Sequence, residues 1–411
     1  MRSHSCLRRF IPLAIFFVFV SCKTTNLPSI GSGDRPFQLE EDEKQVWQNA
    51  KQIEHLYDKS GLLYKDDNLQ VYLEAIAHKL ISPNFQSQGL APRIKVIMHP
   101  FLNAFALPNG VVYFHTGLLA RMDNEAQLAT VLGHELTHFT HRHAVKEMRG
   151  AQNKETFLNV LQGMVVVAGS AYAGGQFGAS LGQLTEQVGS IWTLASVTGY
   201  SRELESEADK EGLKAMVQAG YDPKEAVKVF EHLQRELDER KIKEPFFFGT
   251  HPRLQERIDN YQRLLTAPYA ARAKEEERLI NSGEFLGKIE QLLLDNAILD
   301  LQISRHKTAQ AGIEKLLLRQ PHCARAYFLL GEVHRRSGRG EPYTQRAINA
   351  YQEAARLEPT YANPHRELGL LYRTQNRHEE TRAEFEKYLT LNPKALDANI
   401  IRGYLEGLSK P

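Results

Sequence analysis

The stretch GHELTHFTHRH, residues 133–143, decides how the chain is interpreted. His134 and His138 are four residues apart, so on a helix their side chains share one face, about 6 Å apart along the axis. Both imidazoles can then bind one zinc ion, and Glu135 is placed to take a proton from a water molecule there. The pattern predicts a zinc site, although a five-letter match also arises by chance.

A catalytic zinc needs a third protein ligand, and the stretch SRELESEADKEG, 201–212, offers one. On a helix Glu205 and Asp209 lie on one face. We predict that Glu205 binds the metal and that Asp209 accepts the ring N–H of a ligand histidine, which fixes its tautomer. The alternative is a solvated acidic helix, and Glu203 and Glu207 are predicted to be solvated in this way.

A local third ligand is less favoured. His141 lies one further turn along the helix, beyond the place of the zinc, and no glycine turns the chain back after His138. We therefore predict that His141 and His143 are solvent-exposed or packing residues.

Two helices and two strands are predicted before this site. Helical patterns cover 39–60 and 68–81, and the β-rich runs RIKVIMH (93–99) and VVYFHTG (111–117) predict a small antiparallel sheet. The histidine-bearing helix is expected to begin near Asp123 or Asn124, since either residue can cap it.

Residues 156–201 contain one charged residue, Glu186, and eight glycines. Three interpretations stay open: a loop or helical hairpin over the active site, a hairpin buried in the core, or a segment that dips into a membrane.

The chain repeats from about residue 285. Pro359 and Pro393 are 34 residues apart, which is the tetratricopeptide period. A weaker copy covers about 287–320, and 395–410 is expected to cap the array. We predict a solenoid of about three helix pairs, against the alternative of an unrelated helical bundle.

The first residues resemble a secretory signal. Arginines precede the apolar run at 10–20, and Ser21 and Cys22 follow. Together these residues resemble a bacterial lipobox, in which Cys22 is acylated after removal of 1–21; ordinary signal cleavage is the alternative. Residues 22–38 then form a flexible tether reaching on the order of 20 Å, and Lys23 favours the outer membrane.

Cysteine content and charge narrow the chemistry further. Cys6 leaves with the signal and acylation consumes Cys22, so Cys323 has no partner for an intramolecular disulfide. The net charge of +2 gives no basic footprint for nucleic acid.

The segments 103–119, 124–143 and 201–209 together resemble the HtpX and CAAX-prenyl-protease family of gluzincin peptidases. With the signal and the repeats, the chain is similar to BepA-type periplasmic metalloproteases. The resemblance implies one Zn²⁺ per chain. It also implies the roles of the residues: His134, His138 and Glu205 as zinc ligands, Glu135 as general base, and Asp209 as a residue that contacts a ligand.

His251, in FFFGTHPRLQERI (246–258), precedes a proline. Members of this family often carry a His-Pro loop near the active site. His251 is therefore expected to occupy the open zinc position as a brake or to stabilise the oxyanion. A surface loop histidine is the alternative.

The predicted fold is mostly α with a small antiparallel β-sheet. A zincin-type protease domain (39–270) precedes an α-solenoid (285–411) and is expected to fold without it. The predicted function is a zinc endopeptidase tethered to the outer membrane in the periplasm. It would degrade misfolded or misassembled envelope proteins, whose extended chains add to the edge of VVYFHT (111–116). The alternative is a chaperone or adaptor that binds the outer-membrane assembly machinery through the repeat groove.

Overall fold

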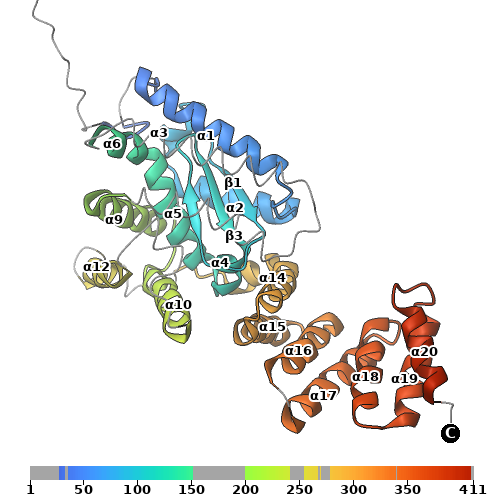
Figure 1. Cartoon of the computed structure of the whole chain (residues 1–411). Coiled ribbons are helices and arrows are strands. Elements are labelled where there is room, and N and C mark those ends of the chain that lie inside the picture. Colours follow the sequence, from blue (N-terminus) through green and yellow to red (C-terminus); the bar gives the residue numbers. More distant parts are fainter. Residues whose placement is uncertain are drawn as a thin grey trace, which may run out of the picture.

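A computed structural model describes residues 27–32, 36–150, 200–240, 254–266, 269, 278–338 and 340–408. Helices surround a three-stranded sheet, and a row of paired helices extends from one end of this body (Figure 1). The predicted fold class is confirmed in its helical content and its two parts. Cys22, His251, the predicted signal and all of 156–201 except Tyr200 and Ser201 lie outside the described residues.

The elements around the sheet follow the chain in this order: α1 Glu41–Lys59, α2 Asp67–Leu80, α3 Pro83–Gln86, β1 Arg93–Ile97, β2 Ala104–Ala106, β3 Val111–His115, α4 Thr116–Arg121, α5 Glu125–Thr140, α6 His143–Gly150, α9 Arg202–Gln218, α10 Lys224–Arg240 and α12 Leu254–Thr266. The elements of the extension are α13 Ser282–Lys288, α14 Glu290–Gln302, α15 His306–Arg319, α16 Ala324–Ser337, α17 Glu341–Leu357, α18 Ala362–Thr374, α19 His378–Leu391 and α20 Ala398–Leu408.

The sheet is mixed, so the predicted antiparallel pairing is wrong. β1 and β3 run parallel, with Arg93 opposite Val111, because the chain between them forms the additional strand β2. β2 pairs antiparallel with β3, so β3 is the central strand and cannot be the edge that the sequence suggested. Residues 62–64 bond the outer side of β1, since Tyr64 N donates to Val96 O at 2.8 Å.

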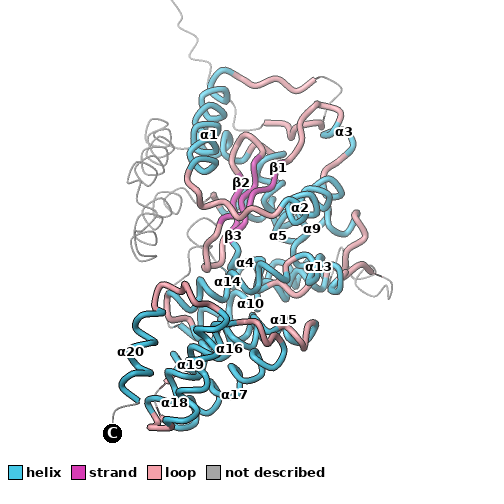
Figure 2. The backbone as a smooth tube through the Cα atoms, turned by 90° about the vertical axis from the view of Figure 1, so that its right-hand side faces the viewer, coloured by secondary structure: helices cyan, strands magenta, loops and turns pink. Residues whose placement is uncertain are grey.

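The sheet and three helices hold the helix that carries the two histidines in place. α5 begins at the predicted cap, because the Asn124 side chain accepts a hydrogen bond from Gln127 N at 2.9 Å. All but the last residue of α5 are buried, between the sheet and the helices α2, α9 and α10. Figure 2 shows α2, α5 and α9 on one side of the three strands. The site helix is thus held rigidly on several sides.

The repeats are confirmed as helix pairs. In the pairs α16–α17 and α18–α19, the first helix carries a glycine against which an aromatic ring of the second helix packs. At Gly331 a Cβ would lie 2.4 Å from the Tyr351 ring, and at Gly369 it would lie 2.4 Å from the Phe385 ring. The matched glycines in the sequence therefore mark close contacts between the helices of α16–α17 and of α18–α19.

The pair α14–α15 packs directly on the sheet-bearing body. Leu292, Leu293 and Leu316 belong to the same hydrophobic core as residues of α2, α4 and α5. Polar contacts join the same surfaces, and Thr116 Oγ1 lies 2.9 Å from Asn296 Oδ1. We call the contact region of α4 with α14 and α15 the junction. The core is continuous across it.

Part of the predicted tether is docked. Leu27 and Ile30 are each 6% exposed, and Ile30 N donates to Thr140 O at 2.7 Å, at the end of the site helix. Residues 27–32 are therefore part of the folded body. Within the described residues, no helix is both long and apolar enough to cross a membrane.

Candidate metal centre

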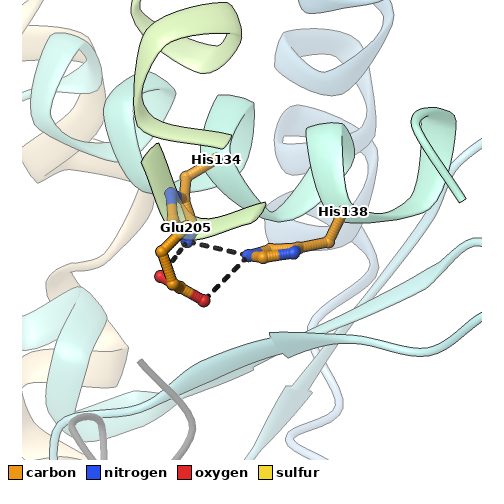
Figure 3. A group of neighbouring side chains, drawn as sticks. All are labelled: His134, His138 and Glu205. Atoms are coloured by element: carbon orange, nitrogen blue, oxygen red, sulfur yellow. Dashed lines mark hydrogen bonds and ion pairs between the residues drawn. The ribbon is translucent and has the colours of Figure 1, made fainter. Parts of the chain in front are cut away.

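His134, His138 and Glu205 converge on one point (Figure 3). The two Nε2 atoms are 3.0 Å apart, and each lies 3.5 Å from an oxygen of the Glu205 carboxylate. All three side chains are buried. The structure thus brings together the predicted ligands from α5 and α9, which are more than sixty residues apart in the chain.

A close approach of α5 and α9 makes this convergence geometrically feasible. Gly133 and Gly212 face each other: a Cβ on Gly133 would lie 2.9 Å from Gly212 O. A Cβ on Gly212 would lie 2.7 Å from His134 N. Any side chain at these positions would force the helices apart. Gly212 also lies on the helix face that carries Glu205 and Asp209, so the contact aims both carboxylates at α5.

The spacing of the donor atoms fits a zinc ion. With Zn–N bonds of about 2.0 Å and tetrahedral angles, two donors lie about 3.3 Å apart. The donor separations between the three residues are 3.0 and 3.5 Å. Two imidazoles and a carboxylate are also a ligand set that zinc prefers in catalytic sites. The three residues therefore fit the metal that the sequence predicts.

Asp209 lies where the sequence expects it, beside the predicted ligand His134. Its Oδ1 is 2.9 Å from His134 Nδ1. Burial raises the pKa of the Asp209 carboxyl, but the charge of Arg257 and the hydrogen bond to His134 outweigh burial and lower that pKa. The carboxylate is thus ionised and able to accept the ring N–H of His134.

A role for Arg257 at this site was not predicted from the sequence. Its Nη2 lies 2.7 Å from Asp209 Oδ1 and 3.0 Å from His134 Nδ1, and the residue is 4% exposed. A buried arginine needs an anionic partner. Its place on an amphipathic helix six residues after His251 was a signal, but the sequence does not say which carboxylate it meets.

His143 is a packing residue, one of the two outcomes predicted for it, and it is fully buried against the predicted ligand His138. It is 0% exposed, and its Nδ1 lies 2.9 Å from His138 Nδ1. Its Nε2 lies 3.3 Å from an oxygen of Glu207, which was predicted to be solvated. The hydrogen bond to His143 and the charge of Lys146 lower the pKa of Glu207 to about 2, although burial opposes them. His141, in contrast, is partly exposed, and Glu203 is exposed as predicted.

Two further neighbours of the histidines are Glu135 and Tyr200. Glu135 is 1% exposed and follows the predicted ligand His134 on α5. The Tyr200 ring stacks on His138, with centroids 4.0 Å apart and planes 15° apart. Burial raises the pKa of the Tyr200 hydroxyl, and the charges of Glu135 and Glu205 raise it further. A stacked neutral phenol therefore covers one face of the ligand ring.

The comparisons with known proteins agree with this geometry. Residues 67–264 match the model of peptidase family M48. The chain contains an M48 peptidase domain. The matched range includes all three converging residues together with Glu135 and Asp209. Residues 294–341 and 344–395 match the tetratricopeptide repeat model, which confirms the predicted repeat region.

Three known proteins resemble part of this chain. The "Beta-barrel assembly-enhancing protease" of Escherichia coli (strain K12) is 29% identical over 209 residues, 48% of this chain and 39% of that protein. The "Metalloendopeptidase OMA1, mitochondrial" of Bos taurus is 30% identical over 53% of this chain and 41% of that protein. The "Mitochondrial metalloendopeptidase OMA1" of Arabidopsis thaliana is 32% identical over 36% of this chain and 26% of that protein. The chain thus spans well under half of each relative.

Proposed function

We propose that this protein is a zinc-dependent endopeptidase acting on unfolded or misassembled proteins of the bacterial envelope. The observation that carries the proposal is the convergence of His134, His138 and Glu205 beside a buried Glu135. A pure scaffold would have no use for three buried donors directed at one point. The M48 match and the metalloendopeptidase names of its relatives support the same chemistry.

The residues divide the reaction among them. His134, His138 and Glu205 would hold one zinc ion, which polarises a scissile carbonyl and acidifies water. Glu135 takes the proton of the attacking water and returns it to the leaving amine. Asp209, held by Arg257, keeps the proton of His134 on Nδ1, so that Nε2 faces the metal.

The substrate is proposed to add to β2 rather than to β3. His115 N donates to Asn103 O and Leu107 N to Val111 O, so the odd-numbered residues of this segment bond to β3. By alternation, the N–H and C=O of Ala104 and Ala106 point away from β3. β2 packs on α5, which carries the histidines. An extended chain that adds here binds through its backbone, which favours unfolded substrates over a particular sequence.

Anchoring at the outer membrane from the periplasm is part of the proposal. It rests on the lipobox resemblance at Cys22 and on a relative named for β-barrel assembly. Because Leu27 is docked, only a few residues separate an acylated Cys22 from the folded body. Cys22→Ser should abolish lipid labelling and release the protein from outer membranes. Continued full partitioning with these membranes would remove this part of the proposal.

His251 keeps its two proposed roles, as a brake in the open zinc position or as a stabiliser of the oxyanion. The brake is favoured. On that reading His251→Ala raises basal cleavage, including self-cleavage. A loss of turnover of roughly 10²-fold with zinc retained would instead identify the oxyanion role.

A second function, as a chaperone or assembly adaptor, is proposed for the repeats. The pairs α16–α17 and α18–α19 project from the body, as Figure 1 shows, and tetratricopeptide arrays dock partner proteins. Outer-membrane assembly machinery is the proposed partner. This role can coexist with proteolysis.

The test compares Glu135→Gln with His138→Ala in the purified mature protein. Wild type should hold about one zinc per chain by the three-ligand argument and should cleave casein. Glu135→Gln should keep the zinc and lose roughly 10²–10⁴-fold in turnover, whereas His138→Ala should lose both. Full activity of Glu135→Gln would overturn the mechanism. The same variant, used as a trap, should retain the natural substrates.

A further inference from the structure

The ligand His138 has a second contact chain on the side away from the proposed metal. We propose that His143 and Glu207 form a positioning chain that fixes the tautomer and the ring orientation of His138. The proposal rests on the proposed function, because it gives His138 the role of a zinc ligand. It assigns a role in the reaction to two residues that the sequence pattern placed outside it.

The contacts of the positioning chain are continuous. His138 Nε2 faces His134 and Glu205, and its Nδ1 lies 2.9 Å from His143 Nδ1. On the far side of the His143 ring, Nε2 lies 3.3 Å from Glu207 Oε2. Glu207 also receives Lys146 Nζ at 3.2 Å. The chain therefore runs from a partly exposed carboxylate inward to the metal centre.

The positions of the protons follow from the contact between the two δ nitrogens. Nitrogens 2.9 Å apart form a hydrogen bond only if one carries a proton and the other offers a lone pair. A ligand His138 uses the lone pair of Nε2 for the metal, so its proton is on Nδ1. His143 must then accept at Nδ1 and carry its own proton on Nε2, which faces the Glu207 carboxylate at 3.3 Å. Every proton in the chain has one consistent place.

Backbone geometry places His143 in this chain. α5 ends at Thr140, and Arg142 adopts φ 57°, the left-handed conformation, which turns the chain into α6. Arg142 is stabilised there by Glu43, to which its Nε donates at 2.9 Å. The turn brings His143 back toward His138, whereas a continued helix would have carried it away. A non-glycine residue in this conformation is strained, so the surrounding contacts must offset the cost.

The positioning chain is the counterpart of the contact at the other ligand. Asp209 accepts from His134 Nδ1 directly, at 2.9 Å. At His138 the carboxylate of Glu207 acts through an intervening imidazole. Partners of this kind orient ligand rings and raise their basicity, and their removal typically weakens metal binding 10- to 100-fold.

The experiment separates hydrogen bonding from packing by two substitutions at one position. In His143→Asn the Oδ1 atom occupies nearly the place of Nδ1 and can still accept from His138, whereas His143→Leu fills the space without an acceptor. The zinc dissociation constant is measured by chelator competition, and the visible spectrum of the cobalt-substituted protein reports the ligand geometry. His141→Leu is the matched control, because His141 lies on the same turn and contacts Thr140, while its ring only approaches that of His143 edge-on, with centroids 5.9 Å apart.

His143→Leu should bind zinc 10- to 100-fold more weakly and shift the cobalt spectrum. His143→Asn should stay close to wild type, and so should His141→Leu. Glu207→Ala should give a smaller loss than His143→Leu, with Glu203→Ala as its exposed control on the same helix. Wild-type affinity and spectrum in His143→Leu, or equal losses in Leu and Asn, would overturn the positioning chain.

Two further measurements distinguish a failure of the proposed function from a failure of the positioning chain. If wild type itself binds no zinc, the proposed function fails first and the inference fails with it. If His143→Leu does not fold, long-range ¹H–¹⁵N spectra of the zinc-loaded wild type decide instead. They should show the proton of His138 on Nδ1 and that of His143 on Nε2. The opposite tautomer of His143 would overturn the inference.

Discussion

Two buried polar regions of this protein are built in opposite ways: the interface of α5 with α9, and the junction of α4 with α14 and α15. At the α5–α9 interface, donor atoms of His134, His138 and Glu205 are directed at a common point. At the junction, polar groups are directed at one another. Arg121 Nη2 lies 3.1 Å from Asp300 Oδ2, and Asn296 Nδ2 donates to the same oxygen at 3.0 Å.

Lys315 is the clearest example of a polar group at the junction whose partners all belong to the protein. Its Nζ donates to the carbonyls of Ala120, Arg121 and Met122 at 3.1–3.2 Å and lies 2.8 Å from Asp123 Oδ1. These carbonyls belong to the C-terminal end of α4, where a cation is favoured. Burial lowers the pKa of Lys315, although Asp123 opposes that effect.

The difference teaches what a buried polar cluster means. Groups that satisfy one another join two surfaces, whereas lone pairs that converge require something between them. The junction is therefore a structural joint, and the α5–α9 interface is the proposed binding site. The following predictions test this distinction, beginning with the largest effect.

Removal of the first helix pair should have the largest effect. A chain ending at residue 284 loses the leucines of α14 and α15 from the shared core. Burial of each such side chain contributes about 1.5–3 kcal/mol, and several together approach the whole stability of a domain, about 5–15 kcal/mol. This truncation should be insoluble, whereas a chain ending at residue 320 should stay folded and bind zinc. Solubility and thermal melting of both truncations measure the effect. A soluble, zinc-loaded 284-residue chain would show that the junction is dispensable and that the limit at 285 is a true domain boundary.

An added methyl group should lower the stability of the protein at the α5–α9 interface and raise it at the junction. Gly212→Ala places its Cβ 2.7 Å from His134 N, so it should cost about 1–3 kcal/mol and weaken zinc binding more than tenfold. Gly312→Ala, in α15 of the junction, meets no atom within 4 Å. It should stabilise by about 0.5–1 kcal/mol, because alanine favours helix over glycine. Chemical denaturation and zinc affinity of both variants check the contrast. Equal responses at the two positions would contradict it.

Loss of the Lys315 charge should destabilise the protein without changing its affinity for zinc. Lys315→Met keeps the aliphatic stem but removes the donors to the end of α4, at a cost of about 1 kcal/mol. Thermal melting should fall by a few degrees, and zinc affinity and casein cleavage at 25 °C should equal wild type. A change in zinc affinity would mean that the joint and the site are coupled.

The smallest effect is a pH dependence at Asp123. The Asp123 carboxyl has a lowered pKa: burial raises it, but His232 and Lys315 outweigh burial. A depressed carboxyl pKa gives stability that is present above the unfolded value, about 3.9, and is lost as pH falls through the folded value. The side chain is 46% exposed, so the gain stays below about 1 kcal/mol. Asp123→Asn should be slightly less stable at pH 7, and the gap from wild type should narrow progressively as pH falls below about 4. A gap that stays constant down to pH 2 would exclude this origin.

Much of the site could be predicted from the chain because its parts are local and periodic. The i, i+4 spacings of His134 with His138 and of Glu205 with Asp209 place each pair on one face of its helix, and the structure has both helices. The Asn124 cap and the repeat period are local in the same sense. Local spacing does not report what approaches from elsewhere, so Arg257, Tyr200 and the contact of His143 were missed.

The sheet shows the other limit of local information. Residues 93–97 and 111–115 have the composition of strands, but direction depends on what lies between them, and the short strand β2 was not recognised. Three residues give too short a pattern to identify a strand. Because β2 was not recognised, residues 111–115 were wrongly predicted to form an edge strand.

The sequence by itself determined the ligand types, their helical faces, the repeat array and the M48 resemblance, because these depend on residue identity at short spacing. Tertiary structure alone decided which elements meet. It set Gly133 against Gly212, joined α14 and α15 to the core, and turned His143 onto His138 through the left-handed Arg142. The physical reason is that each of these contacts depends on packing between segments distant in the chain, and such packing leaves no period in the sequence.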